Sequence, residues 1–269
     1  MNEEQIYTEY FSGRKLYGDD FDQNALKDWY ASEEEGYSGL DSSHNNPGAY
    51  EYHALNRQNS FRFLPKKKFS KVLGFGSADG GEFEPIASII EHLTIIEPSR
   101  EFAREVVHGI PANYVVPNAE GLLDFEDDTF DLVVCMSALH HVANVTSVVR
   151  ELARCTKPGG YLLIREPTVS MGDWRAPRRG LTEHERGIPI GIMREIFNSA
   201  GLQTDREIRC WSPLTPRPWR ITKKPVFNSN FATRIDRIAS MMFSFMYTYH
   251  PTKKFQKFQP SAACWVLRK

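Results

Sequence analysis

The sequence predicts an α/β protein with a doubly wound, mostly parallel β-sheet. From Lys71 to about Cys210, short apolar runs alternate with helical patterns, which is typical of parallel strands joined by helices. A glycine-rich turn in VLGFGSADGGEF follows the first apolar run, at the position where such sheets bind ligands. The 269 residues, 41% hydrophobic and 25% charged, suffice for one large domain with additions.

The alternating region predicts its own strands and helices. Strands are expected at Lys71–Phe75, Leu93–Glu97, Tyr114–Val116, Asp131–Met136, Tyr161–Arg165 and Gln203–Cys210. Helices are expected at Glu82–Glu91, Arg100–His108, Thr146–Cys155 and Ile190–Ala200. The run Lys157-Pro158-Gly159-Gly160 ends one of these helices, because proline cannot continue a helix and glycine accepts positive φ.

The segments outside this region are expected to add to it. Residues 1–70 are rich in aromatic and acidic side chains and predict a helical cap, with helices near Asn24–Ser32 and Tyr50–Phe63. Residues 212–260 predict a basic and apolar insertion that serves as a lid, a dimer contact or a substrate element. Its apolar side chains recur at helical spacing, at Phe231, Ile235, Ile238, Met242 and Phe245. Residues 261–269 predict a last strand that returns to the core of residues 71–211.

Charge is unevenly distributed along the chain. Residues 1–50 carry eight more acidic than basic side chains, and residues 212–260 carry eight more basic than acidic ones. Two solvated surfaces that attract each other are the simpler interpretation. A basic rim for an anionic substrate or a membrane surface is the sharper one. The net charge of −1 does not indicate a nucleic-acid partner.

The compartment is predicted to be the cytoplasm. The four cysteines show no C-x-x-C spacing, which favours reduced structural thiols, and no metal site is predicted. The first residues, MNEEQIYTEYF, are acidic where a signal peptide would be basic and then apolar. No apolar run approaches the roughly 18 residues that a membrane span needs.

The glycine-rich turn predicts a cofactor loop. Glycines let the backbone approach a ligand closely, and a following helix start offers free N–H groups. The sixth position of a G-x-G-x-x-G pattern starting at Gly74 is Asp79, which weakens a nicotinamide interpretation, and no P-loop pattern is present. Glu97 ends the second strand 21 residues beyond Gly76, where a carboxylate can accept both hydroxyls of a ribose.

Two later blocks complete the pattern: NAEGLLDFEDDTFDLVVCMSALHHV and LARCTKPGGYLLIREP. With the loop and Glu97 in this order, the sequence resembles the class I S-adenosylmethionine-dependent methyltransferases. The resemblance is strongest from Lys71 to Glu166. It implies a Rossmann-like sheet of seven strands, the last one antiparallel, and S-adenosyl-L-methionine as the cofactor. It also implies methyl transfer to oxygen or nitrogen of a small-molecule or glycan-like acceptor.

The resemblance implies a set of cofactor-binding residues. These are Gly74, Phe75, Gly76, Ser77, Ala78, Gly80, Glu97, Pro98, Asn118, Ala119, Glu120, Met136, Ser137 and, from the cap, Arg57. Gly74, Ala78 and Asn118 stand where the family more often has Asp, Gly and Asp. Substitution of Gly76 or Glu97 is expected to abolish cofactor binding, whereas Asp at position 74 is expected to be tolerated.

Candidates for catalysis and acceptor binding follow the fourth and fifth strands. His140 or His141 is a candidate general base, since both lie at the carboxyl edge of the sheet and histidine titrates near neutral pH. Candidate acceptor residues are Glu166, Asp173, Arg175, Arg178 and His184. Arginines would suit an anionic acceptor. The alternative is a solvated loop whose arginines pair with Glu183 and Glu185.

Other functions remain open from the sequence. A non-catalytic scaffold subunit with the same fold is the first alternative, because of the three departures in the cofactor residues. An NAD-dependent oxidoreductase is the second. The basic segment with MMFSFMYTYHPTKKFQKF leaves open a peripheral contact with anionic lipid or a homodimer.

Overall fold

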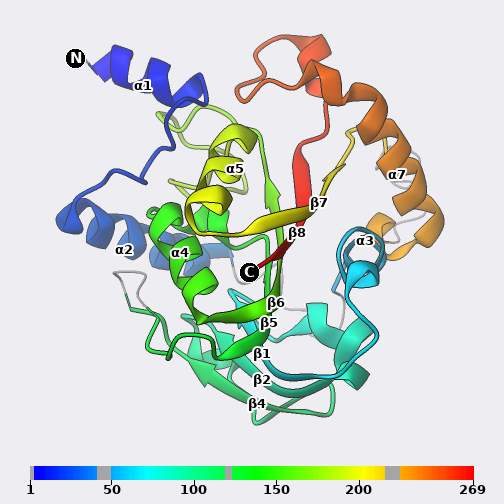
Figure 1. Ribbon diagram of the computed structural model, residues 1–269. Helices are drawn as coiled ribbons and strands as arrows, with labels where there is room; N and C mark the ends of the chain where they lie inside the picture. Colours follow the sequence, from blue (N-terminus) through cyan, green and yellow to red (C-terminus); the bar gives the residue numbers. More distant parts are fainter. Residues whose placement is uncertain (1–2, 41–49, 119–122, 216–224) are drawn as a thin grey trace.

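One mixed β-sheet organises the protein (Figure 1). The computed structural model describes residues 3–40, 50–118, 123–215 and 225–269. The strands are β1 (Phe69–Phe75), β2 (Ile90–Ile96), β3 (Val106–Val107), β4 (Ile110–Val115), β5 (Phe130–Met136), β6 (Thr156–Pro167), β7 (Gln203–Cys210) and β8 (Ala262–Arg268). Within the described residues the order across the sheet is β3-β4-β2-β1-β5-β6-β8-β7.

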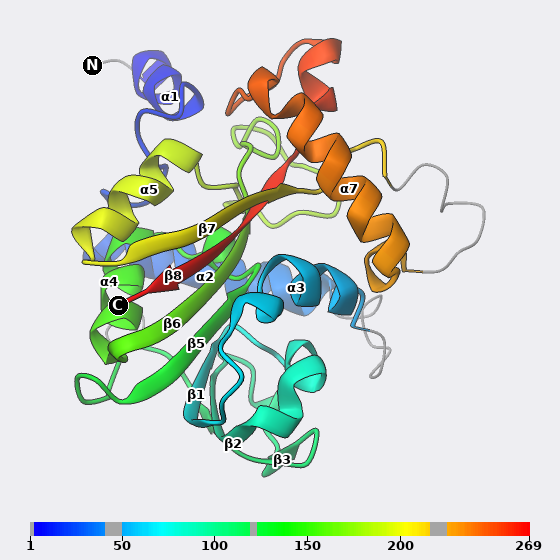
Figure 2. The same ribbon diagram turned by 45° about the vertical axis from the view of Figure 1, so that its right-hand side comes forward.

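Helices cover both faces of the sheet. The α-helices of the described segments are α1 (Glu3–Phe11), α2 (Gln23–Leu40), α3 (His53–Asn59), α4 (Val145–Cys155), α5 (Ile190–Ser199) and α7 (Asn230–Phe243). The 3-10 helices are η1 (Phe61–Phe63), η2 (Gly81–Ile89), η3 (Arg100–Phe102), η4 (Leu139–His141), η5 (Val226–Asn228), η6 (Ser244–Met246) and η7 (Lys254–Phe258). Figure 2 shows α4 and α5 on one side of the sheet, with α3 and α7 on the other.

The predicted fold class is confirmed. β1 pairs in parallel with β2 and β5, and β2 pairs in parallel with β4. β8 runs antiparallel between β6 and β7, as expected of the last strand. The chain first moves outward from β1 through β2 and then returns to β5 on the other side of β1. The carboxyl ends of β1, β2 and β5 therefore border the crevice where open α/β sheets bind ligands.

One predicted helix is wrong and a second differs in type. Residues 100–108 form only the short η3 and then β3, which turns back into β4. His108 and Gly109 connect these strands with φ of 49° and 81°, so the two-residue turn has the positive angles that hairpins favour. The helix expected at residues 82–91 is present as the 3-10 helix η2 (Gly81–Ile89), which has Pro85 inside it and ends where β2 begins at Ile90. The extra short strand raises the predicted seven strands to eight in the described residues.

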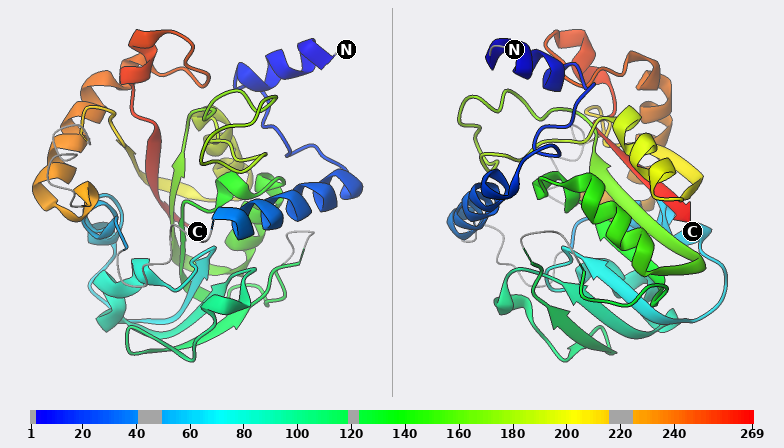
Figure 3. Two further views of the ribbon diagram at one scale, coloured as in Figure 1. Left: turned by 180° about the vertical axis from the view of Figure 1, so that it is seen from behind. Right: turned by 60° about the vertical axis from the view of Figure 1, so that its left-hand side comes forward.

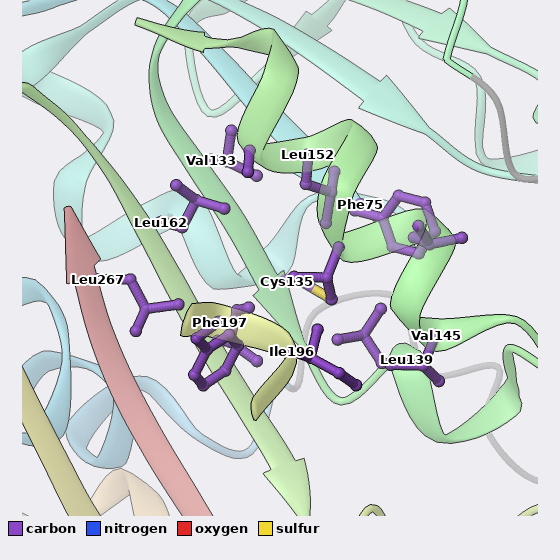
Figure 4. Close-up of a cluster of buried hydrophobic side chains, with 14 of the residues drawn as sticks. Phe75, Val133, Cys135, Leu139, Val145, Leu152, Leu162, Ile196, Phe197 and Leu267 are labelled. Atoms are coloured by element: carbon purple, nitrogen blue, oxygen red, sulfur yellow. The ribbon is translucent and has the colours of Figure 1, made fainter. Parts of the chain in front are cut away.

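Two apolar layers hold the sheet between its helices. Alternate residues of each strand point to opposite faces. On one face, Val133, Leu162 and Leu267 pack with Leu152 of α4 and Phe197 of α5 (Figure 4). The other face is covered by η1 and η2. Its buried members include Val72, Leu132, Leu163 and Val266 of the sheet with Phe61, Phe83 and Ile86.

The N-terminal residues pack in two places. α2 lies beside the start of α4 (Figure 3), where the Trp29 indole N–H donates to the carbonyl of His141 at 2.8 Å. Asp19 accepts from the backbone N–H and the hydroxyl of Thr146. α3 lies on the opposite face beside α7 (Figure 1). The expected cap thus contributes to both sides of the crevice.

The apolar face of α7 points to solvent. Its buried residues are small or polar, namely Ala232, Thr233, Asp236 and Ser240. Asp236 accepts hydrogen bonds from the backbone N–H of Trp211 and Ser212. The apolar residues at helical spacing are exposed: Phe231, Ile235, Ile238, Met241 and Met242 of α7, and Phe245 of the adjoining η6. Among the described helices, none combines the length and apolarity that crossing a bilayer requires.

Candidate functional site

The loop between β1 and η2 adopts conformations that glycine favours. Gly76 and Gly80 have φ of 62° and 75°. A Cβ on Gly76 would lie 2.5 Å from the Cβ of Ala138, which follows β5. The loop therefore lies directly against the β5 loop, at the crevice in the sheet.

Glu97 joins the second strand to this loop. Its carboxylate accepts from the backbone N–H of Ala78 at 3.0 Å and of Ser99 at 3.2 Å. Tyr114 donates to the carbonyl of Ala78 from the neighbouring strand. Burial raises the pKa of Glu97. The carboxylate thus lies beside the glycine loop, as its position in the sequence predicts.

Gly74 has no room for a side chain, contrary to the expected tolerance of Asp at this position. A Cβ there would lie 2.5 Å from the Ser77 hydroxyl and 2.9 Å from a ring carbon of Phe83. The Phe83 ring is fully buried in the second apolar layer and cannot move away easily. The packing around position 74 therefore requires glycine, and this explains why no carboxylate is present there.

Replacing Gly74 by alanine is expected to lower the free energy of unfolding by about 1 to 3 kcal/mol, as overpacking of a core does. Gly191→Ala is the matched control, because a Cβ there meets nothing within 4 Å. Urea unfolding of both variants measures the difference. A Gly74→Ala protein as stable as the Gly191→Ala protein would contradict the packing argument.

A buried guanidinium lies beside the loop that follows β5. Arg165, near the end of β6, is 1% exposed. Its Nη1 donates to Asn56 Oδ1, and Nε and Nη2 donate to the Ser137 hydroxyl at 3.1 and 3.0 Å. The Tyr52 ring lies 4.5 Å away. These partners in the described chain are neutral, so the positive charge is available to an anionic ligand group.

A buried carboxylate accompanies Arg165. Glu82, in the first turn of η2, is 4% exposed, and burial raises its pKa to about 7 while the charge of Arg165 opposes the shift. The Ser77 hydroxyl is buried beside Glu82 and lowers the pKa of that carboxyl, against the effect of burial. Together these groups offer one positive charge, one negative charge and a hydroxyl, which suits the zwitterion of an α-amino acid.

Glu82 should make stability depend on pH. Between about pH 4.5 and 7 the folded carboxyl keeps a proton that the unfolded chain has lost, so the free energy of unfolding falls as pH rises. The loss across this window is about 3 kcal/mol. Urea unfolding at pH 5 and pH 8 should show this loss for the native protein relative to Glu82→Gln. Parallel pH profiles of the two proteins would contradict the raised pKa.

Two histidines lie at the end of η4, each held by a buried carboxylate. His140 Nδ1 lies 2.7 Å from Glu166 Oε2, and His141 Nδ1 lies 2.8 Å from Glu33 Oε2. The other oxygen of Glu166 accepts from the backbone N–H of Ala138 and Leu139. His140 Nε2 faces Glu185 Oε1 at 3.6 Å. Burial, followed by the charge of His140, lowers the pKa of His141.

The candidate acceptor residues fall into different roles. Glu166 orients His140, as just described. The Arg178 guanidinium donates to four carbonyls of its own loop, those of Met171, Thr182, Glu183 and Glu185. Asp173 forms an ion pair with Arg175 at 2.6 Å, and the His184 ring stacks on Trp29 at 4.5 Å. Arg178 therefore stabilises the loop itself instead of presenting its guanidinium to an acceptor.

Several predicted cofactor residues lie at or near the crevice. Phe75 and Met136 end β1 and β5 with buried side chains, and Ser137 contacts Arg165. Pro98 follows Glu97, and Asn118 is exposed shortly after β4. Ala119 and Glu120 lie outside the described residues.

Arg57 contacts the start of α7. Its guanidinium is exposed and donates to Asn230 Oδ1 at 3.2 Å, beside α7. The structure does not support the predicted contact of Arg57 with a cofactor carboxylate, because it pairs Arg57 with Asn230. Arg165 is the buried guanidinium beside Ser137. The sequence signal for Arg165 was a charged residue inside the apolar run YLLIREP. Such a residue is rarely buried without a function or a partner.

Comparison with known proteins agrees with this geometry. Residues 73–164 match a family model described as a methyltransferase domain. Ubiquinone biosynthesis O-methyltransferase of Xanthomonas oryzae pv. oryzae is 32% identical over 100 residues, which are 35% of this chain and 42% of that protein. The Shewanella pealeana protein of the same name is 41% identical over 97 residues, 34% and 41% of the two chains. The matched part thus spans less than half the length of these relatives.

Solved structures with the same fold cover more of the chain. An S-adenosylmethionine-dependent methyltransferase of Leishmania major superposes with a TM-score of 0.55 at 14% identity, covering 89% of this chain and 83% of that one. Another, of Mesorhizobium loti, gives a TM-score of 0.51 at 13% identity over 78% and 95%. At these identities the likeness concerns the fold.

Proposed function

Since the core of this chain is a class I S-adenosylmethionine-dependent methyltransferase domain, we propose that the protein methylates a hydroxyl group of a small-molecule acceptor. One arrangement carries the proposal. At the switch point of the sheet, the glycine loop and Glu97 lie beside the buried charges of Arg165 and Glu82, and the histidines of η4 follow directly. Oxygen is preferred as the methyl acceptor because the similar curated proteins are named O-methyltransferases.

The described residues fit the cofactor. Glu97 would accept from the ribose hydroxyls. Arg165 would bind the carboxylate of the methionine part, and Glu82, with the buried Ser77 hydroxyl beside it, would lie near the ammonium group. When bound, S-adenosylmethionine supplies a methyl group on a sulfonium, so transfer breaks the S–CH3 bond, forms an O–CH3 bond and leaves S-adenosylhomocysteine.

The protein has two further tasks. It must hold the acceptor oxygen in line with the methyl group, and such positioning can lower a barrier by roughly 7 to 11 kcal/mol. It must also remove the hydroxyl proton. His140 and His141 closely follow Ala138, which lies against the glycine loop, and Glu185 faces His140 at 3.6 Å. We assign the activation of the acceptor hydroxyl to this group.

A labelled methyl donor tests the proposal. The protein is incubated with S-adenosylmethionine carrying a labelled methyl group and a panel of phenols, catechols, monosaccharides and amines. The expected result is S-adenosylhomocysteine together with a labelled methyl ether, and loss of both in the Glu97→Ala protein. Binding of S-adenosylmethionine without transfer to any hydroxyl of the panel, but with transfer to amines, would overturn the choice of oxygen. Binding without any transfer would favour a scaffold role.

A further inference from the structure

Three potential ligand atoms converge beside the β5 loop. His140, His141 and Glu185 each offer one nitrogen or oxygen, and these atoms lie within 4.8 Å of one another. The measured separation of His140 Nε2 and Glu185 Oε1 is 3.6 Å. Around a tetrahedral zinc ion with bonds of about 2.0 to 2.1 Å, ligand atoms lie roughly 3.3 to 3.4 Å apart. Small side-chain shifts would bring the three ligand atoms to the separations that a zinc ion requires.

Outer carboxylates already orient both rings. Each histidine has its Nδ1 at a buried carboxylate, Glu166 for His140 and Glu33 for His141. Since Nδ1 and Nε2 lie on different edges of an imidazole, these contacts direct each Nε2 away from Glu166 and Glu33. A carboxylate on the second ring nitrogen is the arrangement that metal-binding histidines usually have.

The outer carboxylates are themselves fixed. Glu33 also accepts from the Thr182 hydroxyl at 2.8 Å. Glu185 is oriented in the same way, because its Oε2 accepts from the Thr182 N–H while its Oε1 faces His140. A single general base needs one such pair. Here two histidines are each oriented by a carboxylate, and Glu185 faces them as a third. This is more than a single general base requires.

We propose that His140, His141 and Glu185 bind a divalent metal ion, with zinc as the best match to two imidazoles and one carboxylate. Three protein ligands leave a coordination position open. Resting on the proposed function, the acceptor hydroxyl would bind there and release its proton to solvent as the metal–oxygen bond forms. The site has no sequence signature, because Glu185 is 44 residues beyond His141.

Metal titration tests the site. Protein stripped with a chelator is titrated with zinc chloride by calorimetry, and with cobalt(II) by visible absorption. One ion per chain is expected. Glu185→Gln and His141→Ala should weaken zinc at least about 10-fold, as should Glu33→Gln through the outer contact. The exposed neighbour Glu183 provides the control, and Glu183→Gln should leave affinity unchanged. Far-UV circular dichroism checks that each variant is folded.

The outcomes separate this proposal from the proposed function. Absence of stoichiometric zinc or cobalt binding, or equal affinity in Glu185→Gln and Glu183→Gln, would overturn the metal site. Full methyl transfer by chelator-treated protein would also overturn it while leaving the methyltransferase function intact. Failure of the protein to bind S-adenosylmethionine, with or without zinc, would instead remove the proposed function.

The exposed face of α7 carries a second, independent inference. Phe231 and Met241 of α7 are 67% and 71% exposed and share one side of the helix with Ile235, Ile238 and Met242. Phe245 of the adjoining η6 is 84% exposed. Exposed apolar patches of this kind mark interaction surfaces. Cations border the patch. Arg234 is exposed among the apolar residues of α7. Burial, followed by the charges of Arg237 and Arg234, lowers the pKa of Arg62, so the three arginines lie near one another.

These features point to an anionic lipid surface as the partner of α7. We infer that α7 lies in the membrane interface, with its apolar side chains inserted among the lipids. The only acid of α7, Asp236, is buried on its opposite face. Pairing of two copies through the same patch would bring their arginines together. An anionic surface satisfies the apolar and the basic groups at once, and exposed Lys253, Lys254 and Lys257 add to the attraction.

Vesicle co-sedimentation tests this inference. The native protein should sediment with vesicles of phosphatidylcholine and phosphatidylglycerol, and at least 10-fold less with phosphatidylcholine alone. Ile238→Glu with Met242→Glu should abolish binding. Val106→Glu, at an apolar residue 57% exposed on β3, should not. No sedimentation of the native protein, or a dimer in light scattering that Ile238→Glu with Met242→Glu dissociates while vesicles remain unbound, would overturn the inference.

Discussion

Replacement of Arg186 by methionine is expected to lower the free energy of unfolding by about 3 to 5 kcal/mol. The Arg186 side chain is fully buried and lies 5.1 Å from the Trp29 ring. Its guanidinium donates to five carbonyls that connect the N-terminal segment with the β5 loop: those of Tyr17, Leu139, His140, Val142 and Ala143. Methionine fills similar space but donates nothing, so these carbonyls lose their buried donor.

Urea unfolding followed by circular dichroism measures this effect. Arg194→Met is the control, because Arg194 is largely exposed and pairs with Glu207, and an exposed ion pair contributes at most about 1 kcal/mol. If the two variants were equally stable, Arg186 would not hold the N-terminal segment to the site. The outcome also bears on the histidines, since two of the five carbonyls belong to Leu139 and His140 of η4.

Arg165→Met is expected to weaken S-adenosylmethionine binding about 100-fold, with a smaller loss of stability than Arg186→Met. A hydrogen bond to a charged group contributes about 1.5 to 3 kcal/mol, and the lost bond would be to the methionine carboxylate. In the free protein, the Arg165 guanidinium donates to the side chains of Asn56 and Ser137, whereas Arg186 donates to five backbone carbonyls, so fewer buried acceptors lose a donor in Arg165→Met.

Calorimetry on both arginine variants separates the two roles. Arg165→Met should remain folded and bind weakly, whereas folded Arg186→Met should keep most of its affinity. Arg57→Met should bind like the native protein, because Arg57 donates to Asn230 on the α7 side. Unchanged affinity in Arg165→Met, or a large loss in Arg57→Met, would contradict the assignment of the methionine site.

The sequence predicted the core of the fold because its signals are local. The apolar runs, the helix at residues 146–155 and the position of Glu97 depend on patterns within a few residues, and all are confirmed. The helix expected at residues 100–108 failed because the His108-Gly109 turn pairs Val106 and Val107 with β4. Tertiary pairing of β-branched residues there outweighed a weak helical pattern.

The site was harder to predict because burial is not visible in a sequence. Arginine is a residue type that can bind an anionic acceptor, but the Arg178 guanidinium donates its hydrogen bonds to carbonyls of its own loop. Arg165 and Glu82 were missed, since only the folded chain shows that both are enclosed near each other. The face that α7 presents to solvent could not be chosen either. Apolar spacing predicts a helix but does not say which side the protein covers.

Binding of S-adenosylmethionine tests the central claim most directly. Titration of the native protein with S-adenosylmethionine or S-adenosylhomocysteine in a calorimeter should show one site per chain, and Glu97→Ala should bind at least about 100-fold more weakly. The carboxylate of Glu97 marks the ribose position in this account. The absence of heat from either ligand with folded native protein would contradict the claim that this crevice is a methyltransferase site.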